Sequence, residues 1–239
     1  LKGSAPGKRK QALANARAAL EKMEPKSKFR PMLEAQIRDA EQKLASQESE
    51  DARKEAAAAE ADAVTLKAVK WRARTLAQEY KFAEARKTVA AATLASDSGK
   101  REKDALSKKL EGLAKFKMLL IQDLNASKYA QPVTRKNGQV MPGEVRRAAQ
   151  QALEVGNQFG GVQISWSELS TETVLQMATS FMRPDLPADR LADRKWYCGM
   201  FAFFAGKDRE GRTLMAEAAG AKTAYGDVLP LILEFPGPL

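Results

Sequence analysis

The sequence has 239 residues, of which 44% are hydrophobic and 29% are charged, and its formal net charge is +10. This length can hold one large domain or two small ones, each able to bury a core. The chain has no histidine, which excludes His-based catalytic triads and zinc sites that use imidazole, and its single cysteine, Cys198, cannot form an intrachain disulfide.

The apolar runs are shorter than a membrane span. The longest, Trp196 to Ala205, is interrupted by Gly199, whereas a helix that crosses a bilayer needs roughly 20 apolar residues. We therefore expect no transmembrane segment. The stretch Leu1 to Lys10 has the composition of a linker, so we expect a fragment of a longer protein, and the sequence favours neither a cytoplasmic nor an exported location.

Positive charge is concentrated in the first half of the chain. Residues Leu1 to Ser127 include 27 basic and 18 acidic side chains, while Lys128 to Leu239 include 13 and 12. A basic N-terminal arm is suited to an acidic partner, a nucleic acid or an anionic membrane surface.

The N-terminal arm is predicted to form an antiparallel helix pair. Lys8 to Met23 has helical periodicity and ends before Pro25, and Ser27 is a suitable N-cap for a second helix that tolerates Pro31 in its first turn. Ala45 to Ala63 follows without any large apolar residue. That stretch is predicted to be an exposed helix or a spacer.

After this stretch, apolar residues again recur with helical spacing up to Tyr80. A second helix with the same kind of spacing follows Tyr80. Small Ala73 and apolar Leu76, followed by Phe82, Ala85, Val89 and Ala92, resemble the spacing of a tetratricopeptide (TPR) helical hairpin. The resemblance implies two antiparallel helices in close contact. The residue pattern places a turn at Ser96 to Gly99, after the second helix. A third helix, Lys100 to Leu124, should pack on them.

The stretch from Tyr129 to Leu169 does not have helical periodicity. Asn137-Gly138 predicts a two-residue hairpin loop with positive φ at both positions, and Pro142-Gly143 predicts a bend or bulge in the next strand. Short strands separated by glycine turns resemble a small SH3-like or Sm-like barrel. The alternative is a helix over 144–155, inserted in a β-hairpin.

The C-terminal arm is predicted to be helical again. Ser170 is a suitable N-cap for a helix to Met182, and Ala188 to Ala205 is apolar nearly all round in its second half, which predicts the central core helix, ended by Gly206. A second TPR-like hairpin is indicated by the small and apolar residues Gly199, Gly211, Met215 and Ala218. The last apolar segment, interrupted by Pro230, is predicted to be a short helix or an extended segment.

The best candidate contact site is the basic stretch around Trp71. Lys67, Lys70, Arg72 and Arg74 flank this tryptophan, so the cations could meet phosphates or acidic side chains while the indole stacks on a base. In the simpler interpretation, which the sequence favours, Trp71 packs in the interior and the charges are only solvated.

Catalytic interpretations are weaker. Asp189 and Asp193 lie four residues apart, but Arg190 and Arg194 have the same spacing, which predicts a salt-bridged helix surface. The serines around Trp166 have no histidine to serve as a base, and Gly160-Gly161 lacks the lysine of a phosphate-binding loop. No catalytic residue, cofactor or metal site is therefore predicted.

The sequence thus predicts a mainly α protein with a small β element in four parts. These are a basic helical arm with a spacer (1–63), a TPR-like hairpin with a packing helix (64–127), an SH3-like β element (128–169) and a C-terminal helical hairpin bundle (170–239). The expected function is non-catalytic protein–protein interaction or scaffolding. The alternative is sequence-nonspecific nucleic-acid binding, and an enzyme of unusual type is the remaining hypothesis.

Overall fold

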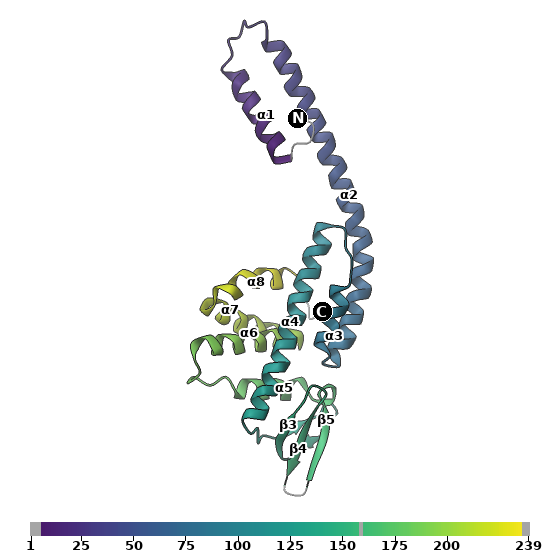
Figure 1. Ribbon diagram of the computed structural model, residues 1–239, viewed down its shortest axis with the longest axis vertical. Helices are drawn as coiled ribbons and strands as arrows, with labels where there is room; N and C mark the ends of the chain where they lie inside the picture. The colour runs from purple at the N-terminus through teal and green to yellow at the C-terminus, as the bar shows by residue number, and fades with distance from the viewer. Residues whose placement is uncertain (1–5, 158–159, 236–239) are drawn as a thin grey trace. The chain divides into compact units, whose positions relative to one another are not determined.

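The computed structural model describes residues 6–157 and 160–235 (Figure 1). Within these residues the chain has eight α-helices and five short strands. The predicted class, mainly α with a small β element, is confirmed. The chain divides into two compact units, Leu1–Glu60 and Ala61–Leu239, and the long helix α2 (Arg30–Gln78) contributes to both.

The first unit is a helix pair made of α1 (Pro6–Glu21) and the first half of α2. Lys10 pairs with Glu48 at 2.7 Å, and Arg17 pairs with Glu41 at 2.5 Å. Later residues of α1 thus meet earlier residues of α2, so the pair is antiparallel, as predicted. Ile37 is the only buried apolar side chain among the described residues of this unit.

The second unit begins with the last part of α2, followed by α3 (Phe82–Ala90) and α4 (Asp97–Ala126). The Ser96 hydroxyl accepts a hydrogen bond from the Gly99 amide at 3.0 Å and caps α4. The helix therefore begins at Asp97, earlier than the predicted Lys100. Residues 97–99, which were expected to belong to a loop, form the start of α4 instead, because the side chain of Ser96 satisfies a free backbone amide there.

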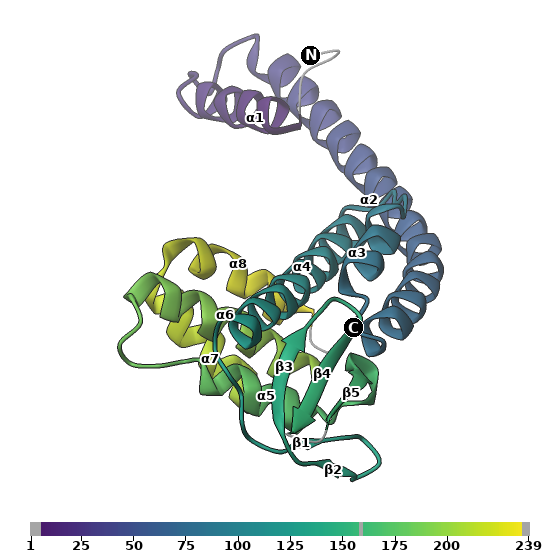
Figure 2. The ribbon, with the colours of Figure 1, turned by 60° about the horizontal axis from the view of Figure 1, so that its bottom comes forward.

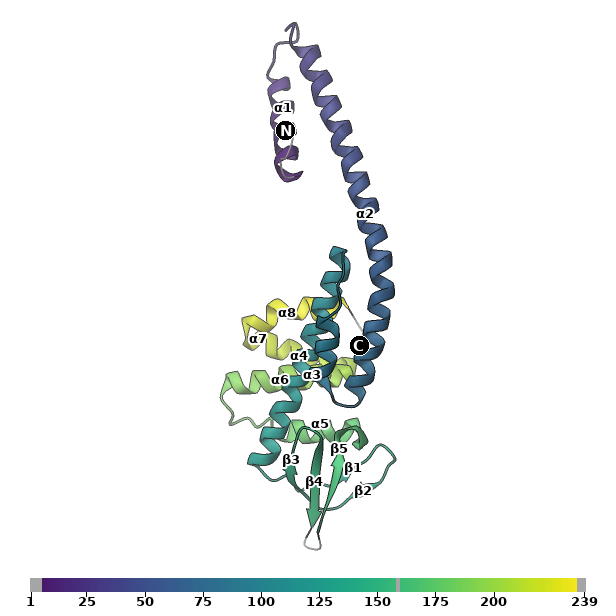
Figure 3. The ribbon, with the colours of Figure 1, turned by 45° about the vertical axis from the view of Figure 1, so that its right-hand side comes forward.

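Strands form the predicted β element after α4. Their bounds are β1 (Val133–Thr134), β2 (Val140–Met141), β3 (Glu144–Ala148), β4 (Ala152–Asn157) and β5 (Gly160–Ser165). The pair β1–β2 and the sheet β3–β4–β5 are both antiparallel, and Figure 3 shows the three strands of the sheet side by side. The helical alternative for 144–155 is wrong.

The hairpin loop differs in detail from the prediction. Arg135 and Gln139 are joined by a backbone hydrogen bond of 2.9 Å, which leaves three loop residues rather than two. Asn137 does not have a positive φ, and within this loop only Gly138 does so, at 83°. The loop is therefore a turn followed by a glycine in the left-handed region, the usual three-residue hairpin connection.

Two isolated bridges and a 3₁₀ turn join the β element to its surroundings. Tyr129 bridges Val145, and Arg135 bridges Leu169, which follows the 3₁₀ turn η1 (Trp166–Glu168). Figure 2 shows the short pair β1–β2 beside the three-stranded sheet. The segment after η1 thus returns to the strand that opened the element.

The last four helices are α5 (Thr171–Ser180), α6 (Ala188–Phe204), α7 (Asp208–Ala221) and α8 (Thr223–Glu234). Ser170 caps α5, and Gly206, with φ of 80°, follows α6, as predicted. Helices α6 and α7 form a close hairpin, because a Cβ on Gly211 would lie only 2.7 Å from the Gly199 carbonyl oxygen. The final segment is helical, although it contains Pro230.

The main core of the second unit joins α2, α3, α4, the sheet, α5 and α6. The rings of Phe116 in α4 and Phe201 in α6 stack at 4.4 Å, and Tyr80 contacts Phe82, Trp166 and Phe201. This confirms that α6 is a central core helix. No helix in the described part of the chain is apolar enough over sufficient length to cross a bilayer.

Candidate functional site

Trp71 lies on the outer side of α2 and is 70% exposed. The opposite side of the helix is buried through Leu66, Ala73 and Ala77. In an α-helix residues 66, 73 and 77 share one face, and position 71 lies roughly opposite to it. The interpretation in which Trp71 packs in the interior is therefore wrong.

The exposed side of α2 combines apolar and basic side chains. Val64, 73% exposed, lies two helical turns before Trp71 and therefore on the same face. Lys67 and Arg74 are exposed near this face, and Arg72 is exposed on its other flank. We call Val64, Lys67, Trp71, Arg72 and Arg74 the α2 face.

The five residues predicted as contacts do not have equal roles. Lys70 is half-buried and its ammonium forms an ion pair with Glu102 of α4. Lys67, Arg72 and Arg74 form no hydrogen bond or ion pair within the described part of the chain. The structure thus leaves Lys67, Trp71, Arg72 and Arg74 available to a ligand, whereas Lys70 is occupied in joining two helices.

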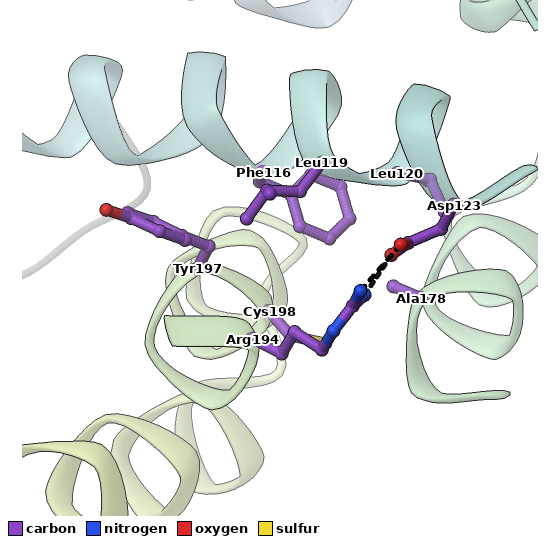
Figure 4. Close-up of a pocket in the computed structure, with 8 residues that line it drawn as sticks. All are labelled: Phe116, Leu119, Leu120, Asp123, Ala178, Arg194, Tyr197 and Cys198. Carbon is purple, nitrogen blue, oxygen red and sulfur yellow. Dashed lines mark hydrogen bonds and ion pairs between the residues drawn. The ribbon is translucent and has the colours of Figure 1, made fainter. Parts of the chain in front are cut away.

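A small cavity lies between α4, α5 and α6 (Figure 4). It is lined by Phe116 and Leu120 on one side and by Arg194 and Cys198 on another, and its volume is about 20 Å³. A cavity of this size holds about one water molecule. It is therefore too small for an organic substrate.

The polar wall of this cavity is an ion pair. The guanidinium of Arg194 donates to both carboxylate oxygens of Asp123, with an Nη2–Oδ1 distance of 2.6 Å (Figure 4). These hydrogen bonds raise the pKa of Arg194 above its ordinary value. Both side chains are mostly buried, and the pair joins α4 to α6.

Cys198 is buried in the same region. Burial raises the pKa of its thiol to about 12. Because the thiolate is the reactive form, this cysteine is a poor nucleophile near neutral pH.

The salt bridges of Asp193 and Arg194 join α6 to other helices instead of running along α6. Asp193 accepts hydrogen bonds from Lys222, at 2.7 Å, and from the hydroxyl of Tyr225. Arg194 binds Asp123 instead. The partners come from other helices, which spacing along one helix cannot reveal.

The other polar groups that the sequence singled out have local structural roles. The Ser165 and Ser167 hydroxyls are 2.9 Å apart at η1, and Ser170 caps α5. Gly160 has a φ of 147° at the start of β5. Within residues 6–157 and 160–235, no cluster of three or more His, Cys, Asp or Glu side chains is arranged to hold a metal ion.

Two lysines of α4, Lys109 and Lys117, are buried, and the sequence analysis did not predict them. The ammonium of Lys117 donates to the carbonyls of Tyr80, at 2.9 Å, and Gln150, at 2.6 Å. Lys109 lies over the ring of Phe203, 5.3 Å from its centroid. Burial lowers the pKa of each to about 8. Both lysines lie on the face of α4 that carries Leu106, Leu110, Leu113 and Leu120, and this position was the available signal.

Comparison of the chain with protein-family models, with curated proteins and with solved structures gave no match.

Proposed function

We propose that this chain is a non-catalytic interaction module that binds a protein partner through the α2 face. The observation that carries the proposal is Trp71, a large aromatic side chain that is 70% exposed on a helix whose other side is buried. Tryptophan is among the residues most enriched at the energetic centres of protein interfaces. Val64, 73% exposed, extends the apolar surface along the helix.

The charges around Trp71 favour an acidic partner. Lys67, Arg72 and Arg74 have no ion-pair partner within the described residues, so they are available for complementary charges that speed encounter and fix orientation. An amphipathic acidic helix or an acidic extended segment would meet both the apolar and the basic parts of the α2 face.

The rest of the second unit would serve as the scaffold that presents this face. We propose that α6 and α7 form a TPR-like hairpin, supported by the close approach of Gly199 and Gly211. An SH3-like barrel for the β element is supported by η1 and by the bridge from Arg135 to Leu169. A rigid support of this kind would hold the α2 face in one conformation and reduce the entropy lost on binding.

Photo-crosslinking tests the proposal. The variant Trp71→p-benzoylphenylalanine is irradiated in an extract of cells that produce the protein, with the same change at Val162, an exposed apolar residue of β5, as the control. We expect one discrete protein adduct from position 71 and none from position 162. Excess unaltered chain should compete for it, and excess Trp71→Ala chain should not. Equal adducts from both positions would contradict the proposal.

The second candidate function is sequence-nonspecific binding of single-stranded nucleic acid. The observation that favours it is the exposure of Trp71 between Lys67, Arg72 and Arg74. An exposed indole can stack on any base, and the cations can contact the flanking phosphates.

Fluorescence anisotropy with a labelled single-stranded oligonucleotide at two salt concentrations tests this candidate. If three cations contact phosphates, the logarithm of the association constant should fall with the logarithm of salt concentration with a slope of about −2. Trp71→Ala should weaken binding about tenfold or more, and Lys136→Gln in the hairpin loop should leave it unchanged. Absence of binding at low salt would eliminate the candidate.

A further inference from the structure

The connection between α1 and α2 and the first turn of α2 expose two large apolar side chains. Phe29 is 66% exposed and Met32 is 56% exposed. Both lie in the short segment 22–32, here called the hairpin tip, which comprises this connection and the start of α2 (Figure 3). Exposed apolar side chains that are grouped in this way commonly mark a binding surface.

The tip is held together without the use of these two side chains. The guanidinium of Arg30 donates to the Met23 carbonyl at 3.1 Å and to the Glu34 carboxylate at 3.0 Å. The Ser27 amide donates to the Glu24 carbonyl at 3.0 Å. These bonds order the backbone of the tip without the exposed parts of Phe29 and Met32.

The charge of the tip is strongly positive. Residues 22–32 contain the lysines Lys22, Lys26 and Lys28 in addition to Arg30, and a single acidic residue, Glu24. The three lysines are exposed and have no hydrogen-bond or ion-pair partner in the described part of the chain. Arg30, by contrast, forms an ion pair with Glu34.

We propose that the hairpin tip docks on a membrane surface that contains anionic phospholipid. Phe29 and Met32 enter the headgroup region, and Lys22, Lys26 and Lys28 contact the lipid phosphates and carboxylates. Shallow apolar insertion together with several lysines is the combination that gives reversible binding to anionic bilayers. This inference does not rest on the proposed role of the α2 face.

The small size of the tip is sufficient for docking on a membrane surface. The tip offers two large exposed apolar side chains. A bilayer needs only that shallow wedge, because the long lysine side chains can extend from it to the headgroups.

Co-sedimentation of the full chain with vesicles tests the proposal, with phosphatidylcholine alone compared with a mixture that includes phosphatidylserine. We expect binding to the mixed vesicles, weakened by salt, and little binding to phosphatidylcholine. The double variant Phe29→Ser/Met32→Ser should weaken binding about tenfold or more. The triple variant Lys22→Gln/Lys26→Gln/Lys28→Gln should do the same. Phe29→Trp should bind at least as well as the unchanged chain, since tryptophan favours the bilayer interface.

Two controls separate the tip from the rest of the chain. Val140→Ser removes another apolar side chain, 56% exposed, and should leave vesicle binding unchanged. Arg72→Gln/Arg74→Gln removes charge from the α2 face and should have at most a small effect. Vesicle binding that survives both tip variants, or that is lost only with the α2-face variant, would overturn the proposal. So would the absence of binding to the mixed vesicles.

Discussion

At the scale of single residues, the buried carboxylate of Asp62 joins α2 to the start of α4. Asp62 is 6% exposed, and it accepts hydrogen bonds from the amides of Ala95 and Ser96 and from the Ser96 hydroxyl. The same hydroxyl caps α4 through the Gly99 amide. One carboxylate on α2 thus orients the cap of another helix, which lies more than thirty residues later in the chain.

We expect Ser96→Ala to lower the free energy of unfolding by about 0.5 to 2 kcal/mol, the range measured for the loss of N-caps. Urea unfolding at neutral pH measures the effect. Ser98→Ala is the comparison within the first turn of α4, and it should have a smaller effect, since Ser98 does not cap the helix.

The stabilisation that comes from the hydrogen bonds to Asp62 should also decrease at low pH. The hydrogen bond from the Ser96 hydroxyl, with those from the backbone, lowers the pKa of Asp62 in the folded chain. A carboxyl group with a lowered pKa stabilises the fold above its ordinary pKa, and that contribution is lost as pH falls through the folded value. Asp62→Asn should therefore be less stable than the unchanged chain at pH 7, with a difference that shrinks toward pH 3. A constant difference would contradict this assignment.

Lys117 should make stability rise with pH as well, but in an alkaline range. Burial lowers the pKa of its ammonium from 10.5 to about 8, so the unfolded chain holds the proton more tightly between these two values. Stability should rise with pH across that window. Relative to Lys117→Met, the unchanged chain should gain about 1 to 2 kcal/mol between pH 8 and 10.5, after allowance for solvent screening. Urea unfolding of both chains over this pH range measures the difference.

At the scale of elements, the hairpin of α6 and α7 depends on two glycines. A Cβ on Gly211 would lie 2.7 Å from the Gly199 carbonyl oxygen and 2.9 Å from the Phe203 Cβ. The two helices can approach this closely only because neither position has a side chain.

Gly211→Ala should therefore destabilise the chain by about 1 to 3 kcal/mol through overpacking. A Cβ on Gly220, in the same helix, would have no neighbour within 4 Å, so Gly220→Ala should instead stabilise the helix by about 0.5 to 1 kcal/mol. Thermal unfolding of the two variants should show shifts of opposite sign, and a shift of the same sign in both would exclude the packing explanation.

Local signals predicted most of the elements. Ser170, Gly138 and Gly206 each mark a cap or turn through their own side chain or backbone freedom, and the structure places them at such positions. The exposure of Trp71 was predictable too. The stripe through Leu66 and Ala73 fixes the buried side of the helix, and position 71 lies opposite to it.

The remaining features of the candidate sites depend on contacts between distant parts of the chain. Asp123 and Arg194 are 71 residues apart, and Lys117 meets the carbonyl of Gln150 from another element. Spacing along one helix reports only neighbours three or four positions away. The pairing of Arg194 could therefore not be derived without the fold.

At the scale of the whole molecule, the two units bury very different amounts of apolar surface. In the described part of the first unit only Ile37 is a buried apolar residue, whereas the second unit has a continuous core around α4 and α6. Stability follows burial, so local opening should require much less free energy in the first unit.

Hydrogen exchange of the intact chain should show this difference. We expect the amides of α1 to be protected at least about a hundredfold less than those of α4, because the helix pair has little apolar surface to lose on opening. Mass spectrometry of peptides from each helix measures the protection. Equal protection in both helices would mean that the first unit is stabilised by contacts outside the helix pair.

Because Cys198 is buried, the reactivity of its thiol measures how often the core of the second unit opens. It is the only cysteine in the chain, and its thiol reaches a labelling reagent only when the packing of α4 against α6 is broken. The rate at which an alkylating reagent modifies the intact protein therefore records how often that interior opens. A ligand that tightens the second unit should slow the labelling, and the measurement needs no change to the sequence.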